Sequence, residues 1–295
     1  RFHESHTKLL TLIEELGISD KVTKLSDDIN YYLRGYSNND QNYNNDELND
    51  KLKNKKLLKK SYEMRYKISD NKLRNISYFQ YLNIIYDYET AEFIKDSFGY
   101  DSEFFKLNAE SALIMFRNDF LFNDNNYYFL NGGLSQIIEK LEDKIKRFHN
   151  IKIIKNCKVE DIKEKYIETK HGKFYFENLI CTIPQKSLQE YNIFKKINEI
   201  NNVTSIPLLR IYIKYSKDNI WFKDIKRTIT NNYIRHIIPI DYDNGLIMIS
   251  YSDGDRTREW DNVYKNGEEF LIKVINQEIY RMFGIKPPRH EFLSF

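Results

Sequence analysis

Cysteine, histidine and long apolar runs are too sparse in this sequence to build several common kinds of site. The chain of 295 residues has 2 cysteines, Cys157 and Cys181, which cannot make a disulfide framework. The 6 histidines are scattered, and none stands at metal-ligand spacing from a cysteine, so we do not expect a metal centre. No stretch of about 18 consecutive apolar residues occurs, so we expect neither a membrane-spanning helix nor a membrane partner.

A signal peptide is also missing from the start of the sequence. The first residue is Arg1 rather than methionine, which indicates an internal piece of a longer protein, cut at both ends. The small number of cysteines is typical of a reducing compartment. We therefore expect an intracellular protein.

The overall composition is that of a folded globular protein. Hydrophobic residues make up 41% of the chain and charged residues 30%, with a formal net charge of +3, which argues against a disordered chain. The length suits one large domain or two ordinary ones. The slight excess of positive charge does not identify a partner.

The stretch from 127 to 184 shows the clearest succession of elements. Tyr127 to Leu130 is a short apolar strand pattern, and Gly132-Gly133 supplies a tight turn because glycine adopts positive φ without steric cost. A helix is predicted next, since apolar residues then recur at helical spacing. These are Leu134, Ile137, Ile138, Leu141, Ile145 and Phe148.

The second half of this stretch alternates like a set of strands. A turn at His171-Gly172 and a stop at Pro184 divide the apolar runs. The order helix, strand, small meander, strand is typical of a layered α/β domain with a three-stranded insert beside its main sheet. The predicted strands are 151–154, 159–162, 166–169, 174–176 and 179–183.

The order and spacing of these pieces resemble the flavin-containing amine oxidase superfamily of monoamine, polyamine and L-amino-acid oxidases. The resemblance covers nearly all of the chain, and it implies an α/β (α+β) fold. Residues 1–20 and 127–190 would form part of a Rossmann-like FAD-binding domain with a β-meander insert. Residues 21–126 and 191–295 would form a substrate domain of mixed sheet flanked by helices. The motifs that carry it are Gly132-Gly133-Leu134, Val159-Glu160-Asp161-Ile162, Gly172 and Cys181-Thr182-Ile183-Pro184.

The resemblance implies an FAD-dependent oxidoreductase. FAD would accept a hydride from the carbon beside the nitrogen of a small amine or amino acid, the imine would be hydrolysed, and O₂ would reoxidise the flavin with release of hydrogen peroxide. Such an enzyme has no nucleic-acid partner. Its cofactor carries the difficult chemistry, and the protein binds and orients the reactants.

Three residues are expected, by the same resemblance, to contact the cofactor. Arg1 would lie beside the flavin or hold a substrate carboxylate, Val159 would contact the adenine through its backbone, and Thr182 would lie near the same part of the cofactor. From residue type alone, Arg1 is a solvated N-terminal arginine and Val159 is a plain strand residue.

Arg210 is the candidate catalytic residue. It lies in a predicted strand, 208–215. In the family that this sequence resembles, the matching strand carries a lysine that binds a water beside the reactive flavin nitrogen. The position of that lysine falls on Ile211 or, with one inserted residue, on Arg210. Arginine remains charged and can orient or stabilise a partner, whereas lysine can also exchange protons. The alternative is an edge residue with a solvated head group.

The glycine-rich Gly-x-Gly-x-x-Gly turn that seats the pyrophosphate of a dinucleotide does not occur in this sequence. We therefore expect the chain alone to hold flavin poorly. A second hypothesis is a non-catalytic structural or interaction protein of the same fold, which Arg210 and the Asn-rich segment 37–50 would suit. A third is a nucleic-acid module based on the lysines of 51–75, where a solvated helical face is the simpler interpretation.

The remaining patterns predict ordinary elements. Helices are expected over 9–16, with Ser5 as N-cap and Gly17 as stop, and over 78–122, 187–200 and 268–283. Residues 18–36 show a mixed pattern. Two strands, 229–240 and 246–251, should form a hairpin through Asn244-Gly245, and 252–260 should be a surface loop.

Overall fold

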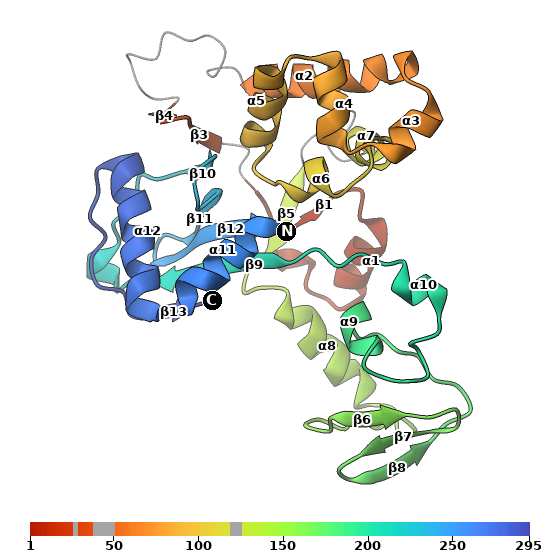
Figure 1. Ribbon diagram of the computed structural model, residues 1–295. Coiled ribbons are helices and arrows are strands. Elements are labelled where there is room, and N and C mark those ends of the chain that lie inside the picture. The colour runs from red at the N-terminus through yellow and green to blue at the C-terminus, as the bar shows by residue number, and fades with distance from the viewer. Residues whose placement is uncertain (26–28, 38–50, 119–125) are drawn as a thin grey trace. The chain divides into compact units, whose positions relative to one another are not determined.

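The computed structural model describes residues 1–25, 29–37, 51–118 and 126–295, and it divides into two compact units (Figure 1). Unit 1 comprises Arg1–Thr23 and Tyr128–Ile206, and unit 2 comprises Lys24–Tyr127 and Pro207–Phe295. Both units combine helices with sheets, so the α/β (α+β) prediction is confirmed. The assignment of flavin binding to one unit and substrate binding to the other stays a prediction.

Unit 1 is built on a three-stranded sheet with the order β1-β5-β2. Its strands are β1 (Phe2–His3), β5 (Tyr127–Leu130) and β2 (Val22–Lys24), which follows the 3-10 turn η1 (Ser19–Lys21). Helices α1 (Thr7–Glu15) and α8 (Ser135–Ile145) contribute to the core beside this sheet. The buried residues of that core are Phe2, Ile13, Ile18, Leu130 and Ile137.

The predicted strand, turn and helix over 127–148 are confirmed. Gly132 and Gly133 have φ values of 86° and 90°, a region that other residues rarely occupy. The amide of Gly133 donates to the carbonyl of Leu130 at 2.8 Å, which closes the turn before α8 begins. The proposed N-cap of α1 was wrong, because the hydroxyl of Ser5 contacts the His3 ring and the helix follows His6.

The predicted three-stranded insert is also confirmed. It is an antiparallel meander of β6 (Val159–Ile162), β7 (Tyr166–Thr169) and β8 (Gly172–Tyr175). The strands predicted at 151–154 and 179–183 do not form, because within the described residues neither segment has a neighbouring strand to receive its backbone hydrogen bonds. The helix predicted over 187–200 is reduced to two short pieces, α9 (Gln185–Leu188) and α10 (Asn198–Asn201).

The helical layer of unit 2 packs around buried aromatic rings. Tyr78 and Phe104 are fully buried and lie 5.4 Å apart between ring centroids, and Phe116 lies 4.9 Å from Tyr78. Ser77 begins one of these helices with a capping box completed by Gln80. The helices are α2 (Lys51–Met64), α3 (Asp70–Asn75), α4 (Tyr78–Ile85), α5 (Tyr88–Phe98), α6 (Ser102–Phe105) and α7 (Ala109–Phe116), with the 3-10 turn η2 (Arg65–Lys67) after α2. They confirm the helical prediction over 78–122 as far as residue 116.

A seven-stranded mixed sheet forms the rest of unit 2. Its order is β13-β9-β12-β11-β10-β3-β4, and neighbouring strands are antiparallel except β10 and β3. The strands are β3 (Ile29–Leu33), β4 (Tyr36–Ser37), β9 (Leu208–Lys214), β10 (Arg227–Thr230), β11 (His236–Asp241), β12 (Leu246–Asp253) and β13 (Phe292–Ser294), and the 3-10 turn η4 (Lys217–Asn219) follows β9. The mixed pattern over 18–36 is thus mainly strand, and the predicted loop 37–50 lies outside the described residues beyond Ser37.

Helices α11 (Asp255–Tyr264) and α12 (Glu268–Phe283) pack against one face of this sheet (Figure 1). Alternate residues of the strands enter the core that they share. The helix predicted over 268–283 is confirmed, and Gly284 ends it at φ 67°. The central residues of this core are Ile211, Ile213, Ile237, Ile247, Ile249, Trp260, Leu271, Ile275 and Ile279.

Two predictions in this unit were wrong. Residues 252–260 are not a surface loop, because a single turn at Gly254 leads directly into α11 and Trp260 is fully buried. The turn-forming sequence Asp253-Gly254-Asp255 accounts for this single turn and not for a longer loop after it. The strand predicted over 229–240 is divided by a tight turn, in which the amide of Thr230 donates to the carbonyl of Arg235 at 2.8 Å. None of the helices in the described residues combines the length and apolar character that a membrane span requires.

Candidate functional site

The sheet face opposite α11 and α12 carries a row of polar and aromatic side chains. Strand register places Tyr251 opposite Arg210, Met248 opposite Tyr212, and Ile229 opposite His236. Paired residues point to the same side of a sheet, and alternate residues point to opposite sides. We call this surface the tyrosine–arginine face; its polar and aromatic members are Tyr31, Arg210, Tyr212, Arg227, His236 and Tyr251.

Arg210 and Tyr251 form a cross-strand pair on this face. The Nη2 atom of Arg210 donates to the Tyr251 hydroxyl at 3.4 Å, and its guanidinium carbon lies 4.8 Å from the centroid of that ring. The hydrogen bond to Tyr251, together with neighbouring Tyr212, raises the pKa of Arg210 above its already high ordinary value. Arg210 is therefore a permanent cation held by tyrosines.

Three rings make an aromatic cluster beside this pair. Tyr100 lies 4.8 Å from His236 and 5.2 Å from Tyr251 between ring centroids, and His236 lies 5.9 Å from Tyr251. Gly99 makes this packing possible, since a Cβ atom there would lie 2.5 Å from the Nε2 atom of His236. The end of α5 thus meets the sheet through an aromatic contact.

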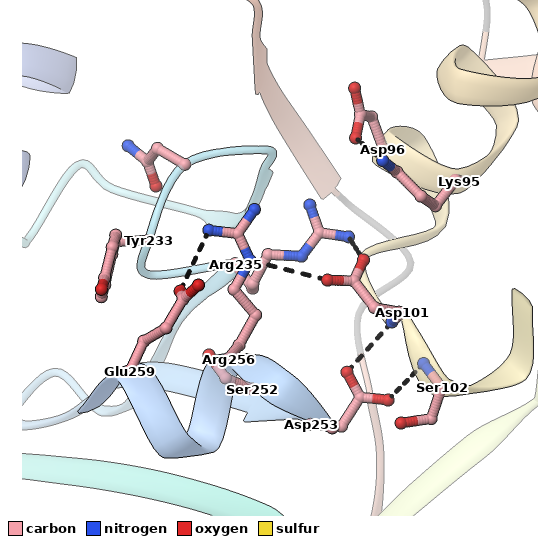
Figure 2. Close-up of polar contacts among 12 residues, drawn as sticks. Lys95, Asp96, Asp101, Ser102, Tyr233, Arg235, Ser252, Asp253, Arg256 and Glu259 are labelled. Atoms are coloured by element: carbon pink, nitrogen blue, oxygen red, sulfur yellow. Dashed lines mark hydrogen bonds and ion pairs between the residues drawn. The ribbon is translucent and has the colours of Figure 1, made fainter. Parts of the chain in front are cut away.

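A buried charge network fixes the backbone next to these rings (Figure 2). The carboxylate of Asp253 accepts from the backbone amides of Asp101 and Ser102 at 3.0 and 2.9 Å. Asp101 in turn accepts from Nη2 of Arg235 at 3.0 Å, and Arg235 is only 1% exposed. Tyr100 precedes Asp101 and His236 follows Arg235, so the network orients two members of the aromatic cluster.

Arg235 occupies a demanding position in this network. Its φ of 62° is unusual for a residue with a side chain, and its Nη1 donates to the carbonyl of Thr230 at 3.0 Å. Burial lowers the pKa of Arg235, and the charge of Asp101 opposes that shift. Arg256 adds a second cation 3.6 Å from Asp101. A buried arginine of this kind is stabilised by its partners.

Glu103, in α6, is a perturbed acid beside the network. Its Oε2 atom is buried and has no hydrogen-bond partner among the described residues. Burial raises the pKa of Glu103 to about 7, and the negative charges of Asp253 and Asp101 add to the effect. This carboxyl group thus changes charge near neutral pH.

This shift predicts a pH-dependent stability. The pKa of Glu103 is 4.5 in the unfolded state and about 7 in the folded state, so between these two pH values the folded state binds more protons at Glu103. The contribution of Glu103 to stability therefore falls as pH rises from 4.5 to about 7. The full penalty, reached above about pH 7, is on the order of 3 kcal/mol. We expect Glu103→Gln to gain about 2–3 kcal/mol on the wild-type protein between pH 5 and pH 8 in urea denaturation.

Glu110→Gln is the matched control. A hydrogen bond from Arg74 lowers the pKa of Glu110, so this carboxylate stabilises the fold above its ordinary pKa of 4.5 and loses that contribution only as pH falls below it. Between about pH 5 and pH 8 the stability of the control variant relative to wild type should therefore stay nearly constant. If Glu110→Gln also gained stability on the wild-type protein over this pH range, the burial of Glu103 would not be the cause.

The residues predicted to bind the cofactor all lie in unit 1. Arg1 and Thr182 are exposed, whereas Val159 is half-buried in β6. The backbone carbonyl of Val159 accepts from the hydroxyl of Tyr191 at 2.9 Å. Arg210 belongs to unit 2, where it lies on the tyrosine–arginine face. No group of three or more metal-ligating side chains occurs among the described residues.

Sequence reasoning missed most of this site. Tyr100, His236, Tyr251 and Asp253 were not singled out, because they lie in separate segments and meet through the strand order and the packing of α5. Gly99 was an available signal, since a glycine after a helix often marks a close approach.

Comparison with solved structures finds a similar fold in several proteins named as oxidases. A mutant of putrescine oxidase with redesigned cofactor binding has a similar fold, with a TM-score of 0.74 at 12% identity, covering 98% of this chain and 71% of that one. Cyclohexylamine oxidase from Brevibacterium oxydans IH-35A gives a TM-score of 0.69 at 12% identity, with 99% and 71% covered. A putative protoporphyrinogen oxidase from Exiguobacterium sp. 255-15 gives 0.64 at 14% identity, with 99% and 73% covered. These likenesses show the fold.

At the level of sequence, a comparison with curated proteins finds no match. The family model described as flavin containing amine oxidoreductase, however, matches residues 1–294, which is nearly the whole chain. The chain therefore belongs to the flavin-containing amine oxidoreductase family.

Proposed function

We propose that this chain forms the greater part of an FAD-dependent amine oxidase that oxidises the C–N bond of a small amine or amino acid, with O₂ as the final acceptor. The observation that carries this proposal is the tyrosine–arginine face, a polar sheet surface in a chain that belongs to a flavin-dependent family. Putrescine oxidase and cyclohexylamine oxidase, whose fold the chain shares, are named for amine substrates.

Unit 1 has surface of the kind that a flavin nucleotide would cover. The segments 151–154 and 179–183 expose apolar side chains, and Ile180 is 88% exposed. Exposed apolar side chains suit a large, partly apolar cofactor, so the residues present fit FAD in kind. Arg1, Val159 and Thr182 would hold it, with the guanidinium of Arg1 able to bind phosphate or carboxylate oxygens.

When bound, flavin supplies the acceptor for the two electrons that leave the substrate. The residues of the tyrosine–arginine face bind and orient the substrate. Arg210 is the candidate catalytic residue among them, and it acts as a fixed positive charge rather than as a proton carrier. Tyr251 holds the guanidinium of Arg210 in place.

The cofactor assignment is tested by the absorption spectrum of the purified whole protein and by chromatography of any flavin released on denaturation. A flavin spectrum with FAD as the released compound supports the proposal. A colourless protein that does not take up added FAD contradicts it and favours a non-catalytic structural or interaction protein of the same fold.

Thr182→Glu tests the contact that Thr182 is proposed to make. A carboxylate at this position would have to lose water where the adenine part of FAD binds, and its charge would oppose the negative charge of the cofactor, so we expect FAD affinity to fall about tenfold or more. The matched control is Thr204→Glu, which adds the same charge at another exposed threonine of unit 1. FAD titration of the apoprotein measures both. Equal affinities in the two variants would remove Thr182 from the cofactor site.

A further inference from the structure

The charges of the tyrosine–arginine face are unevenly distributed. Of the strand residues that register places on this side of β9 and β12, Arg210 and Lys214 are cations and Asp253 is the acid. Both oxygens of Asp253 accept backbone amides, and Lys214 is paired with Glu291 at 3.8 Å. The central strands therefore offer a substrate a cation, Arg210, without offering a carboxylate.

Acids of the helical layer are also engaged. Asp101 is paired with Arg235 at 3.0 Å, and Asp96 lies 3.5 Å from Lys95 (Figure 2). Burial favours the protonated form of Glu103, as described above. On these elements a substrate ammonium group thus meets acids that are already paired with a cation or with backbone amides, and a half-buried Glu103, which carries its full charge only above about pH 7.

Arg210 is well arranged to bind an anion. Among the described residues, no carboxylate lies within 4.0 Å of its guanidinium. A guanidinium has five N–H donors, and in the described part of the chain only neutral tyrosine hydroxyls, those of Tyr251 and Tyr212, accept from this one, so donors remain for the oxygens of a carboxylate. An exposed arginine is often only solvated, but the ring and hydroxyl of Tyr251 restrict this one before any ligand arrives.

An apolar wall stands directly beside this anion site. Tyr251 contacts the guanidinium of Arg210 and the ring of Tyr100, and both tyrosines are partly exposed, whereas His236, which packs against them, is fully buried. A ligand that placed its carboxylate on Arg210 would bring its side chain against the exposed parts of the two tyrosine rings. Aromatic rings bind large apolar or aromatic groups well.

We propose that the substrate carries a carboxylate that binds Arg210, so that it is an α-amino acid with a large apolar or aromatic side chain rather than a diamine or polyamine. This inference rests on the proposed function. A diamine would bring its distal ammonium group toward a cation and would leave the guanidinium without a partner. Arg210 then determines specificity by direct contact with the substrate.

Matched substrate pairs test this inference. Each pair is an α-amino acid and the amine that remains when its carboxylate is removed: L-phenylalanine with phenethylamine, L-leucine with 3-methylbutylamine, and L-ornithine with putrescine. The whole flavin-loaded protein is mixed with each compound without oxygen, and the rate of flavin bleaching is followed by stopped flow. We expect kcat/KM to favour the amino acid by about tenfold or more in the first two pairs.

Arg210→Gln should remove that preference. We expect the ratio of kcat/KM for amino acid over amine to fall about tenfold to a hundredfold, and Arg210→Lys, which keeps the charge without the planar fork, should retain part of it. Lys214→Gln is the matched control, four residues along the same strand, and should leave the ratio unchanged. Binding of 3-phenylpropanoate, compared with 3-phenylpropan-1-ol, gives a readout without turnover.

The outcomes separate the two proposals. Bleaching by amines alone, or an equal loss for both members of a pair in Arg210→Gln, overturns the carboxylate inference while the proposed function stands. A bound flavin that neither amines nor amino acids bleach contradicts the proposed function, and the inference falls with it.

Discussion

Gly245→Ala is expected to cost about 3–5 kcal/mol of unfolding free energy, enough to unfold much of unit 2. A Cβ atom at this position would lie 2.2 Å from the backbone oxygen of Tyr215, and φ is 72°. The carbonyl of Gly245 also accepts the amide of Tyr215 at 2.9 Å, so the two backbones are held together at the point of overlap. Relief requires the backbone to move, because no flexible side-chain end is involved.

Gly284→Ala is the control for this prediction. Gly284 has a similar φ of 67°, but nothing lies within 4 Å of the added Cβ. Only the conformational cost remains, which is about 1–2 kcal/mol. Urea denaturation of the two variants measures the difference. Similar losses in both would show that Gly245 is required for its φ alone and that the close approach to Tyr215 is unimportant.

Asp253→Asn is expected to cost about 3 kcal/mol, the second large effect. The carboxylate of Asp253 satisfies two buried backbone amides, and an amide side chain can accept only one of them with its oxygen while its NH₂ group faces the other. The substitution also removes a negative charge from a network that contains the buried Arg235. We expect the contact between Tyr100 and His236 to loosen, with loss of near-ultraviolet circular dichroism.

Asp255→Asn tests whether charge alone explains that loss. Asp255 stands two residues away, its side chain is 72% exposed, and it pairs with Arg258 at 3.6 Å. An exposed pair of this kind contributes about 0.5 kcal/mol, and the position in the first turn of α11 adds a similar amount. If Asp255→Asn destabilised the protein as much as Asp253→Asn, the capping role of Asp253 would be wrong.

Local signals predicted several elements correctly. The hairpin at Asn244-Gly245, the glycine turn before α8 and the end of α12 at Gly284 each follow from residues that favour one backbone conformation. The errors at 151–154 and 252–260 have another origin. Whether residues 151–154 form a strand depends on a neighbouring strand, which their own sequence does not reveal. Residues 252–260 have the composition of a loop, but they begin a helix because Trp260 packs in the core.

The site was less predictable than the fold. Arg210 could be proposed because its strand resembles one in the family, but its contact with Tyr251 depends on the order β9-β12 and on the register of that pair. Asp253 and Asp101 are 152 positions apart in sequence, and no periodicity links them. Arginine is rarely buried unless it is paired, so the sequence alone does not predict the burial of Arg235, which depends on partners that only the structure identifies.

The most direct test of the proposed oxidase activity is the visible spectrum of the purified whole protein under anaerobic conditions, recorded before and after addition of L-amino acids and their matched amines. We expect a flavin band that a carboxylate-bearing substrate bleaches and that returns when oxygen is admitted, with formation of hydrogen peroxide. A protein that binds FAD yet keeps its oxidised spectrum with every amine and amino acid would contradict the proposed oxidase.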